Sequence, residues 1–146
     1  MPKIDIMALI PTETPEETFT ERVKPPYDAY MSDPGCEWKA GAAAYGVGHF
    51  PEWIFQYYKH HDPSRIHKIS KIKDFRDSLF KQCPELEVVF DVAEANKHRF
   101  LEHRPRTVRG ATEAFLAGER LMLPGGRFFD EVLRRAYDFL RRWAGL

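Results

Sequence analysis

The chain is organised around Phe90-Asp91-Val92-Ala93-Glu94-Ala95-Asn96-Lys97-His98, a stretch that places acids, an amide, a base and an imidazole on one predicted helix. Cys83-Pro84-Glu85 marks the beginning of this helix and Arg104-Pro105 marks its end. Its apolar residues recur at helical spacing: Leu86, Val89, Phe90, Ala93 and Phe100. We therefore expect a mostly buried helix, with Asn96 inside its apolar stripe and Lys97 at the border.

Two further helices are expected before this stretch. The first begins at Ser32-Asp33-Pro34, where Asp33 can cap free amides and Pro34 has no N–H to lose. A single stripe continues in phase across Pro51, which predicts a kinked helix: Trp38, Ala42, Tyr45, His49, Trp53 and Tyr57. The second helix opens at Asp62-Pro63-Ser64 with the same device and ends at Cys83.

The two ends of the chain are predicted to differ. Residues 1–32 contain five prolines and little periodicity, which indicates an extended arm with at most a short helical turn between 15 and 22. Residues 107–123 lose the helical period and predict a small β-hairpin, and a last helix follows from about 128 to 144. The expected fold is mainly α, an antiparallel bundle of three or four helices in a single domain, 33–146, preceded by the arm.

Composition is that of an ordinary single-domain globular protein. The 146 residues are 43% hydrophobic, 30% charged and 14% aromatic, so we expect one aromatic-rich core. No apolar run approaches the roughly 20 residues that span a bilayer, and the proline and acids after residue 10 do not fit a secretory signal. We expect a cytoplasmic protein with no membrane partner, in which Cys36 and Cys83 are reduced.

The charges are balanced in number but unevenly placed. Basic and acidic residues number 22 each, so the formal net charge is zero. Residues 1–35 carry three basic and seven acidic side chains, whereas residues 97–146 carry eleven and six. The acidic beginning is expected to lie over the basic C-terminal part. A nucleic-acid partner is compatible with the sequence, although the net charge does not indicate one.

Polar residues on the first and third predicted helices suggest a site between them. If these helices pack antiparallel, Glu52 meets Lys97 or His98, and a carboxylate beside either group is typical of general acid–base catalysis. The candidate catalytic residues are Glu52, Asp91, Lys97 and His98, and the candidate binding residues are His49, Trp53, Asn96, Arg99 and His103. The same pattern is more often that of buried polar groups that satisfy one another and fix the helix register.

No cofactor or metal is predicted. His60, His61 and His67 lack metal-ligand spacing, and consecutive histidines point about 100° apart on a helix. Gly46-Val47-Gly48 has neither the preceding strand nor the later Gly-Lys of a phosphate-binding loop. These motifs therefore supply no cofactor site.

Three segments together resemble a group of small bacterial and phage-associated helical proteins, a resemblance that implies no particular activity: Pro25-Pro26-Tyr27-Asp28-Ala29-Tyr30, His49-Phe50-Pro51-Glu52-Trp53-Ile54-Phe55 and Asp91-Val92-Ala93-Glu94-Ala95-Asn96-Lys97-His98. More loosely, the topology is similar to that of the higher-eukaryote and prokaryote nucleotide-binding (HEPN) helical bundles, many of which are ribonucleases in toxin or defence systems. The HEPN resemblance implies RNA cleavage by His98, Arg99 and His103. Arg99 and His103 are closer together here than in the family's motif.

Two hypotheses from different functional classes follow. The first is a binding or regulatory helical module, a homodimer that uses an aromatic face to bind a protein partner. Exposure of large aromatic residues would mark that face: Trp38, Tyr45, Tyr58 or Phe128. The second is a metal-independent ribonuclease or nucleotide-binding enzyme that uses Glu52, Lys97 and His98 across a dimer groove.

Overall fold

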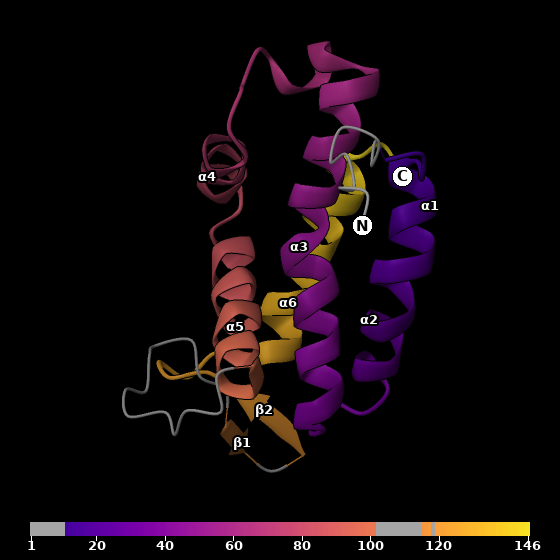
Figure 1. Cartoon of the computed structure of the whole chain (residues 1–146). Helices are drawn as coiled ribbons and strands as arrows, with labels where there is room; N and C mark the ends of the chain where they lie inside the picture. Colours follow the sequence, from indigo (N-terminus) through magenta and orange to yellow (C-terminus); the bar gives the residue numbers. More distant parts are fainter. Residues whose placement is uncertain (1–10, 102–114, 118) are drawn as a thin grey trace, which may run out of the picture.

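The computed structural model describes residues 11–101, 115–117 and 119–146, with side chains except at 97–101 and 115–117. The fold is mainly α, as the periodicity predicts, with helical segments packed antiparallel and a short hairpin before the last helix (Figure 1). The elements are α1 (Pro15–Thr18), η2 (Phe19–Val23), α2 (Lys24–Met31), α3 (Glu37–His61), η3 (Pro63–Ile66), α4 (Ile72–Gln82), α5 (Pro84–Leu101), β1 (Phe115–Ala117), β2 (Arg120–Met122) and α6 (Phe129–Trp143).

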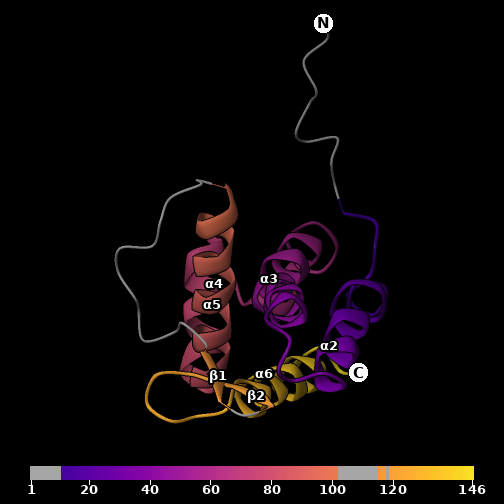
Figure 2. The same ribbon diagram turned by 90° about the horizontal axis from the view of Figure 1, so that it is seen from below.

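Helix α3 lies at the centre of the bundle (Figures 1 and 2). It runs antiparallel to α2 on one side and to α5 on the other, and α6 packs against its inner face. The buried residues of α3 are mostly small or aromatic: Ala40, Ala43, Ala44, Val47, Phe50, Ile54, Phe55 and Tyr58. Because α3 packs against α2, α4, α5 and α6, it is the helix around which the single core is built.

Two glycines let α3 approach its neighbours closely. A Cβ atom at Gly46 would lie 2.8 Å from the carbonyl oxygen of Arg22, and a Cβ atom at Gly48 would lie 3.2 Å from the Cα atom of Phe90. Both contacts are with backbone, which cannot swing aside as the end of a flexible side chain can. The absence of side chains at Gly46 and Gly48 therefore sets how near the N-terminal segment and α5 come to α3.

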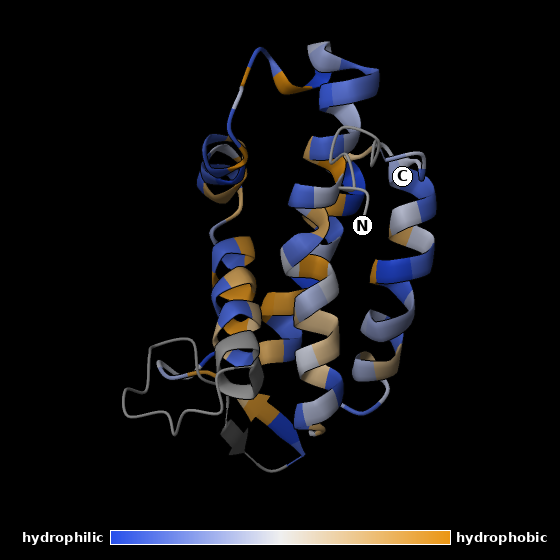
Figure 3. Ribbon diagram, viewed as in Figure 1, coloured by the Kyte–Doolittle hydropathy of each residue, from blue (hydrophilic) through white to orange (hydrophobic). Residues whose placement is uncertain are grey.

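Aromatic rings hold α6 against the other helices at both of its ends. The rings of Tyr27 and Tyr137 are stacked, with centroids 3.7 Å apart, and the rings of Tyr30 and Phe129 are 5.7 Å apart. Near the C-terminal end of α6, Trp143 lies against rings from α3 and α4. The polar face of α6 is exposed, so this helix shows the ordinary amphipathic pattern (Figure 3).

One backbone carbonyl connects three segments. The hydroxyl of Tyr30 donates to the carbonyl oxygen of Pro34 at 3.0 Å, and the amide of Leu121 donates to the same oxygen at 3.2 Å. Burial raises the pKa of Tyr30, so its hydroxyl keeps the proton that it donates. The α2–α3 connection is thereby bonded both to α2 and to the hairpin, whose Leu121 and Leu123 are buried in the core.

The extended arm predicted for residues 1–32 is wrong for the part that the structure describes. Residues 15–31 form one helical segment, made of α1, the π-helical turn η2 and α2. The hydroxyl oxygen of Thr14 accepts a hydrogen bond from the amide of Glu17, so the segment has an ordinary N-terminal cap.

The prolines of this segment do not break it. Pro25 and Pro26 occupy the first turn of α2, directly after the π-helical turn. A proline cannot donate the α-helical bond to the residue four before it, and a π-helical turn follows a different bonding pattern. The prediction failed because it weighted the prolines over an apolar stripe of helical spacing that the structure buries: Phe19, Val23, Tyr27 and Tyr30.

Two of the predicted helices have different bounds. Helix α3 begins at Glu37 instead of Pro34, and it continues through Pro51. The helix predicted for 62–83 is divided into η3 and α4. The division occurs because His67 and Lys68 have φ of 48° and 63°, a left-handed conformation that ends a right-handed helix.

The remaining elements agree more closely with the sequence. Helix α5 begins at Pro84 and α6 at Phe129, each within one residue of the predicted start. The hairpin is confirmed over a shorter range, with β1 antiparallel to β2 and Leu116 opposite Leu121. Residues 107–114 of the predicted hairpin lie outside the described residues.

Substitution of the two glycines Gly46 and Gly41 tests the close approach of α3. Replacing either glycine by alanine raises the helix propensity by about 1 kcal/mol. A Cβ atom at Gly41 would meet only the flexible side-chain amide of Asn96, at 3.0 Å, instead of backbone. Gly46→Ala is expected to lower the free energy of unfolding by about 1–2 kcal/mol, whereas Gly41→Ala leaves it unchanged or raises it. Urea unfolding followed by circular dichroism measures both. Equal stability of the two variants would contradict the packing described.

Candidate functional site

The outward face of α3 carries aromatic side chains. Trp38 and Tyr45 lie two turns apart, and they are 75% and 52% exposed. The stripe that the sequence singles out on this helix therefore starts on the solvent side and becomes half-buried further along, at Trp53. Of the residues predicted to mark a binding face, Trp38 and Tyr45 are exposed, whereas Tyr58 is buried and Phe128 is half-buried.

His49 is the polar centre of this region. Its imidazole is largely buried and lies between two carboxylates, with Nδ1 3.6 Å from Oε2 of Glu52 and Nε2 3.5 Å from Oε1 of Glu94. Glu52 is on the same helix, one turn further on, and Glu94 comes from α5. The site is thus built by the packing of α3 on α5.

Three aromatic rings surround the imidazole of His49. The ring of Tyr45 is 4.5 Å away, that of Phe90 is 5.9 Å away and that of Trp53 is 6.5 Å away, measured between centroids. These rings cover the faces and edge of His49, while the carboxylates of Glu52 and Glu94 stay partly exposed. The imidazole is therefore held in a largely apolar surround with its two nitrogens directed at acidic groups.

An imidazole between two carboxylates is an arrangement that can donate or accept a proton. A neutral imidazole carries one N–H and can donate to only one of the two carboxylates, whereas the protonated ring has an N–H for each. Among the described residues, the buried Nε2 of His49 has no hydrogen-bond partner that meets ordinary geometry. A hydrogen bond of Nε2 to Glu94 would form with a movement of a few tenths of an ångström, and such tightening is usual when a catalytic or binding site closes on its ligand.

The structure brings together only part of the predicted site. His49, Glu52 and Trp53 lie together as described, but Asn96 lies opposite Gly41, about two turns of α3 away from His49. Asp91 is exposed on α5, beside Glu87 and Glu94. For Lys97, His98 and Arg99 the structure gives the helical backbone of α5 without side-chain positions, and His103 lies outside the described residues. The predicted meeting of Glu52 with Lys97 or His98 stays a prediction.

Sequence reasoning missed Glu94 as a neighbour of His49, and it placed Tyr45 on the same stripe as His49 without assigning it to the site. Tyr45 lies four residues before His49 on the same helix, so helical spacing alone places the two rings together. Glu94 needs the register of α3 against α5, which follows from Gly48 packing on the backbone of α5 at Phe90. Gly48 is the feature of the sequence that could have indicated this register, because a glycine within a helix can mark close approach of a neighbouring helix.

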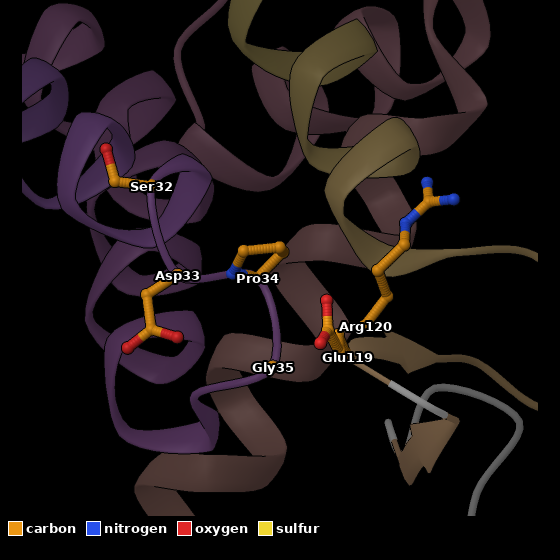
Figure 4. A pocket seen from close by; sticks show the side chains of 6 residues that line it. All are labelled: Ser32, Asp33, Pro34, Gly35, Glu119 and Arg120. Atoms are coloured by element: carbon orange, nitrogen blue, oxygen red, sulfur yellow. The ribbon is translucent and has the colours of Figure 1, made fainter.

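A shallow hollow lies elsewhere, between the α2–α3 connection and the hairpin (Figure 4). Its lining consists of Ser32, Asp33, Pro34, Gly35, Glu119 and Arg120. The guanidinium of Arg120 is already paired, at 2.7 Å from Asp130 and 3.1 Å from Glu131, and Asp33 is paired with Lys39. The hollow contains none of the predicted site residues, so we assign it a structural role.

The histidines near the end of α3 do not gather around one point. His60 and His67 are exposed, and Nε2 of His61 is 2.6 Å from the carbonyl oxygen of Pro11. Among the residues that the structure describes, no three His, Cys, Asp or Glu side chains are placed to hold a metal ion.

Compared with models of known protein families, with curated proteins and with solved structures, the chain matches none. In the described part of the chain, no helix is both long and apolar enough to cross a bilayer.

Replacement of Asp91 tests the acidic surface of α5. Desolvation raises the pKa of Asp91, and the carboxylates of Glu87 and Glu94 raise it further, so its charge disfavours the folded chain at neutral pH. This penalty is present above the raised pKa and absent below the ordinary value of 3.8. Asp91→Asn is expected to raise the melting temperature at neutral pH, and the gain should vanish near pH ~3.

The matched control for this prediction is Asp74→Asn. Asp74 lies in the first turn of α4, where the helix dipole favours a negative charge, so its neutralisation is not expected to stabilise the protein. Thermal unfolding of both variants at several pH values makes the comparison. A gain for Asp91→Asn that persists unchanged in acid would show that charge is not its cause.

Proposed function

We propose that the protein is a binding or regulatory module that pairs with a second copy of itself through α3. The contact surface, called the aromatic face, consists of Trp38, Ala42, Tyr45 and Trp53. The observation that carries the proposal is the exposure of Trp38 and Tyr45 on one side of one helix. Large aromatic residues in such a position are typical of interface hot spots.

The aromatic face is supported from behind. Helix α3 is packed against α2, α5 and α6, so the backbone under the face is fixed. The ring of Tyr45 lies 6.1 Å from that of Trp53 and 4.5 Å from that of His49. Side chains that are already positioned lose little conformational freedom when a partner covers them, and this favours affinity.

A second copy of the chain suits this face for two reasons. The formal net charge is zero, so two copies do not repel each other at long range. A two-fold pairing would place the aromatic face against its own copy. Both copies of Trp38 and of Tyr45 would then be buried in the same interface. A cytoplasmic location and a homodimeric state are both parts of this proposal.

Sedimentation equilibrium over a range of protein concentrations tests the pairing. Trp38→Ala and Tyr45→Ala are each expected to raise the dissociation constant of the dimer at least about tenfold, because each removes a central aromatic contact. Leu146→Ala is the control, since Leu146 is exposed but lies at the C-terminus, away from the face. A wild-type chain that stays monomeric far above micromolar concentration would exclude the second copy as the partner.

A second candidate function is a metal-independent ribonuclease or nucleotide-binding enzyme, of the HEPN-like type in a defence or toxin system. The observation that favours it is the imidazole of His49 between Glu52 and Glu94. In such an enzyme His49 would exchange a proton with the substrate, and the carboxylates would orient the ring and balance its charge.

RNA cleavage in the presence of a chelator tests the second candidate. His49→Ala is expected to reduce cleavage by about 10²–10⁴-fold, the usual contribution of general acid–base catalysis. Glu52→Ala and His98→Ala are measured beside it, and His67→Ala is the control because His67 is exposed in the turn before α4. Absence of cleavage by the unaltered protein, or equal cleavage by His49→Ala, would exclude this function.

A further inference from the structure

One end of the molecule carries a concentrated positive charge. Residues 59–73, called the basic cap, cover the end of α3, the turn η3 and the start of α4 (Figure 1). These fifteen residues contain five lysines and arginines, three histidines and one acid, Asp62. Every one of the nine ionisable side chains is exposed. The formal charge of the cap is thus +4, in a chain whose total is zero.

The lysine side chains of the basic cap differ from those of Lys24 and Lys39, which are paired with acids. Lys24 is paired with Asp28 at 2.6 Å and Lys39 with Asp33 at 3.2 Å. Within the described part of the chain, the side chains of the four lysines of the cap make no ion pair or hydrogen bond: Lys59, Lys68, Lys71 and Lys73. Like charges within one fifteen-residue stretch repel one another, and an anionic partner would relieve that repulsion.

Arg65 has a structural role that the four lysines of the basic cap lack. Its guanidinium donates to the carbonyl oxygen of Trp143 at 3.1 Å and lies over the rings of Tyr58 and Trp143. Arg65 therefore joins the cap to the end of α6. The cap is in this way a supported surface, and its four lysines are the part that is available to a ligand.

We propose that the basic cap binds the phosphate backbone of duplex DNA, without preference for base sequence. The lysines supply point charges with no forked donor geometry, which suits phosphate contacts more than the reading of base edges. This binding surface is distinct from the aromatic face of α3 and from the His49 site, and it requires neither of them.

The residues around the lysines favour a duplex over the other polyanions. Single-strand binding relies on exposed aromatic rings for base stacking, and the exposed large hydrophobic residues of the described chain, Trp38, Tyr45 and Leu146, all lie outside the cap. The same distribution argues against a membrane surface, since Ile66, Ile69 and Ile72 of the cap pack against the core. Regularly spaced phosphates on a duplex match a surface whose exposed charged groups are mainly positive.

Fluorescence anisotropy with a labelled DNA duplex of about 20 base pairs, titrated at several salt concentrations, tests the proposal. Four phosphate contacts predict that log Kobs falls with log salt at a slope of about −3.6. The double variant Lys68→Gln/Lys71→Gln is expected to reduce that slope to about half. The matched control is Lys24→Gln/Lys39→Gln, which removes the same charge from paired lysines and should leave the slope unchanged.

A single variant separates binding from folding. Lys68 has a φ of 63°, a conformation that glycine adopts without the penalty of a side chain. Lys68→Gly should therefore keep or raise the melting temperature while lowering the magnitude of the salt slope by about 0.9. Equal slopes for the wild type and the cap variants would overturn the proposal. Tighter binding to a single strand, to anionic vesicles or to polyglutamate than to the duplex would overturn it as well.

Discussion

The close approach of α3 to the backbone on either side of it is the constraint on which the rest of the structure depends. Gly46 and Gly48 lie two positions apart, so they point to nearly opposite sides of the helix. One receives the carbonyl of Arg22 and the other receives α5 at Phe90. With α6 against its inner face, α3 has a single strip left for solvent, and that strip is where Trp38 and Tyr45 are found.

The polar centre follows from the same packing. The register that sets Gly48 against Phe90 also brings His49 within reach of α5, where its Nε2 lies 3.5 Å from Oε1 of Glu94. The two nitrogens of His49 then face different helices, one toward Glu52 of α3 and one toward Glu94 of α5. His49 therefore connects α3 and α5 through an acidic group on each helix, beside the exposed aromatic residues.

Much of the fold could be predicted because helical periodicity is a local signal. The apolar spacing around Phe90 and the amphipathic pattern of the last helix gave α5 and α6 nearly correct starts. Residues 15–31 were predicted wrongly because Pro25 and Pro26 were treated as helix breakers, whereas a proline in a first turn costs little. The left-handed pair His67 and Lys68 has only a weak signature in sequence, since histidine is enriched at positive φ but that conformation is still uncommon for residues other than glycine.

The candidate site was less predictable because it depends on the register between helices. His49, Glu52 and Trp53 share one helix, so their proximity could be inferred from spacing. The partner across α5 could not, since a shift of one turn would bring Asp91 or Lys97 in place of Glu94, and only the glycine contact decides between them. The charge distribution is likewise not evident from the composition, because a formal net charge of zero gives no sign of the basic cap at residues 59–73.

The carbonyl of Pro34 has a consequence for how the molecule opens. It accepts from the hydroxyl of Tyr30 and from the amide of Leu121, so α2, the connection to α3 and the hairpin share one acceptor. Detachment of the hairpin would remove half of that shared bonding and expose the buried side chain of Leu121 together with it. We therefore expect these three segments to open together, so that their backbone amides exchange with solvent in a single event.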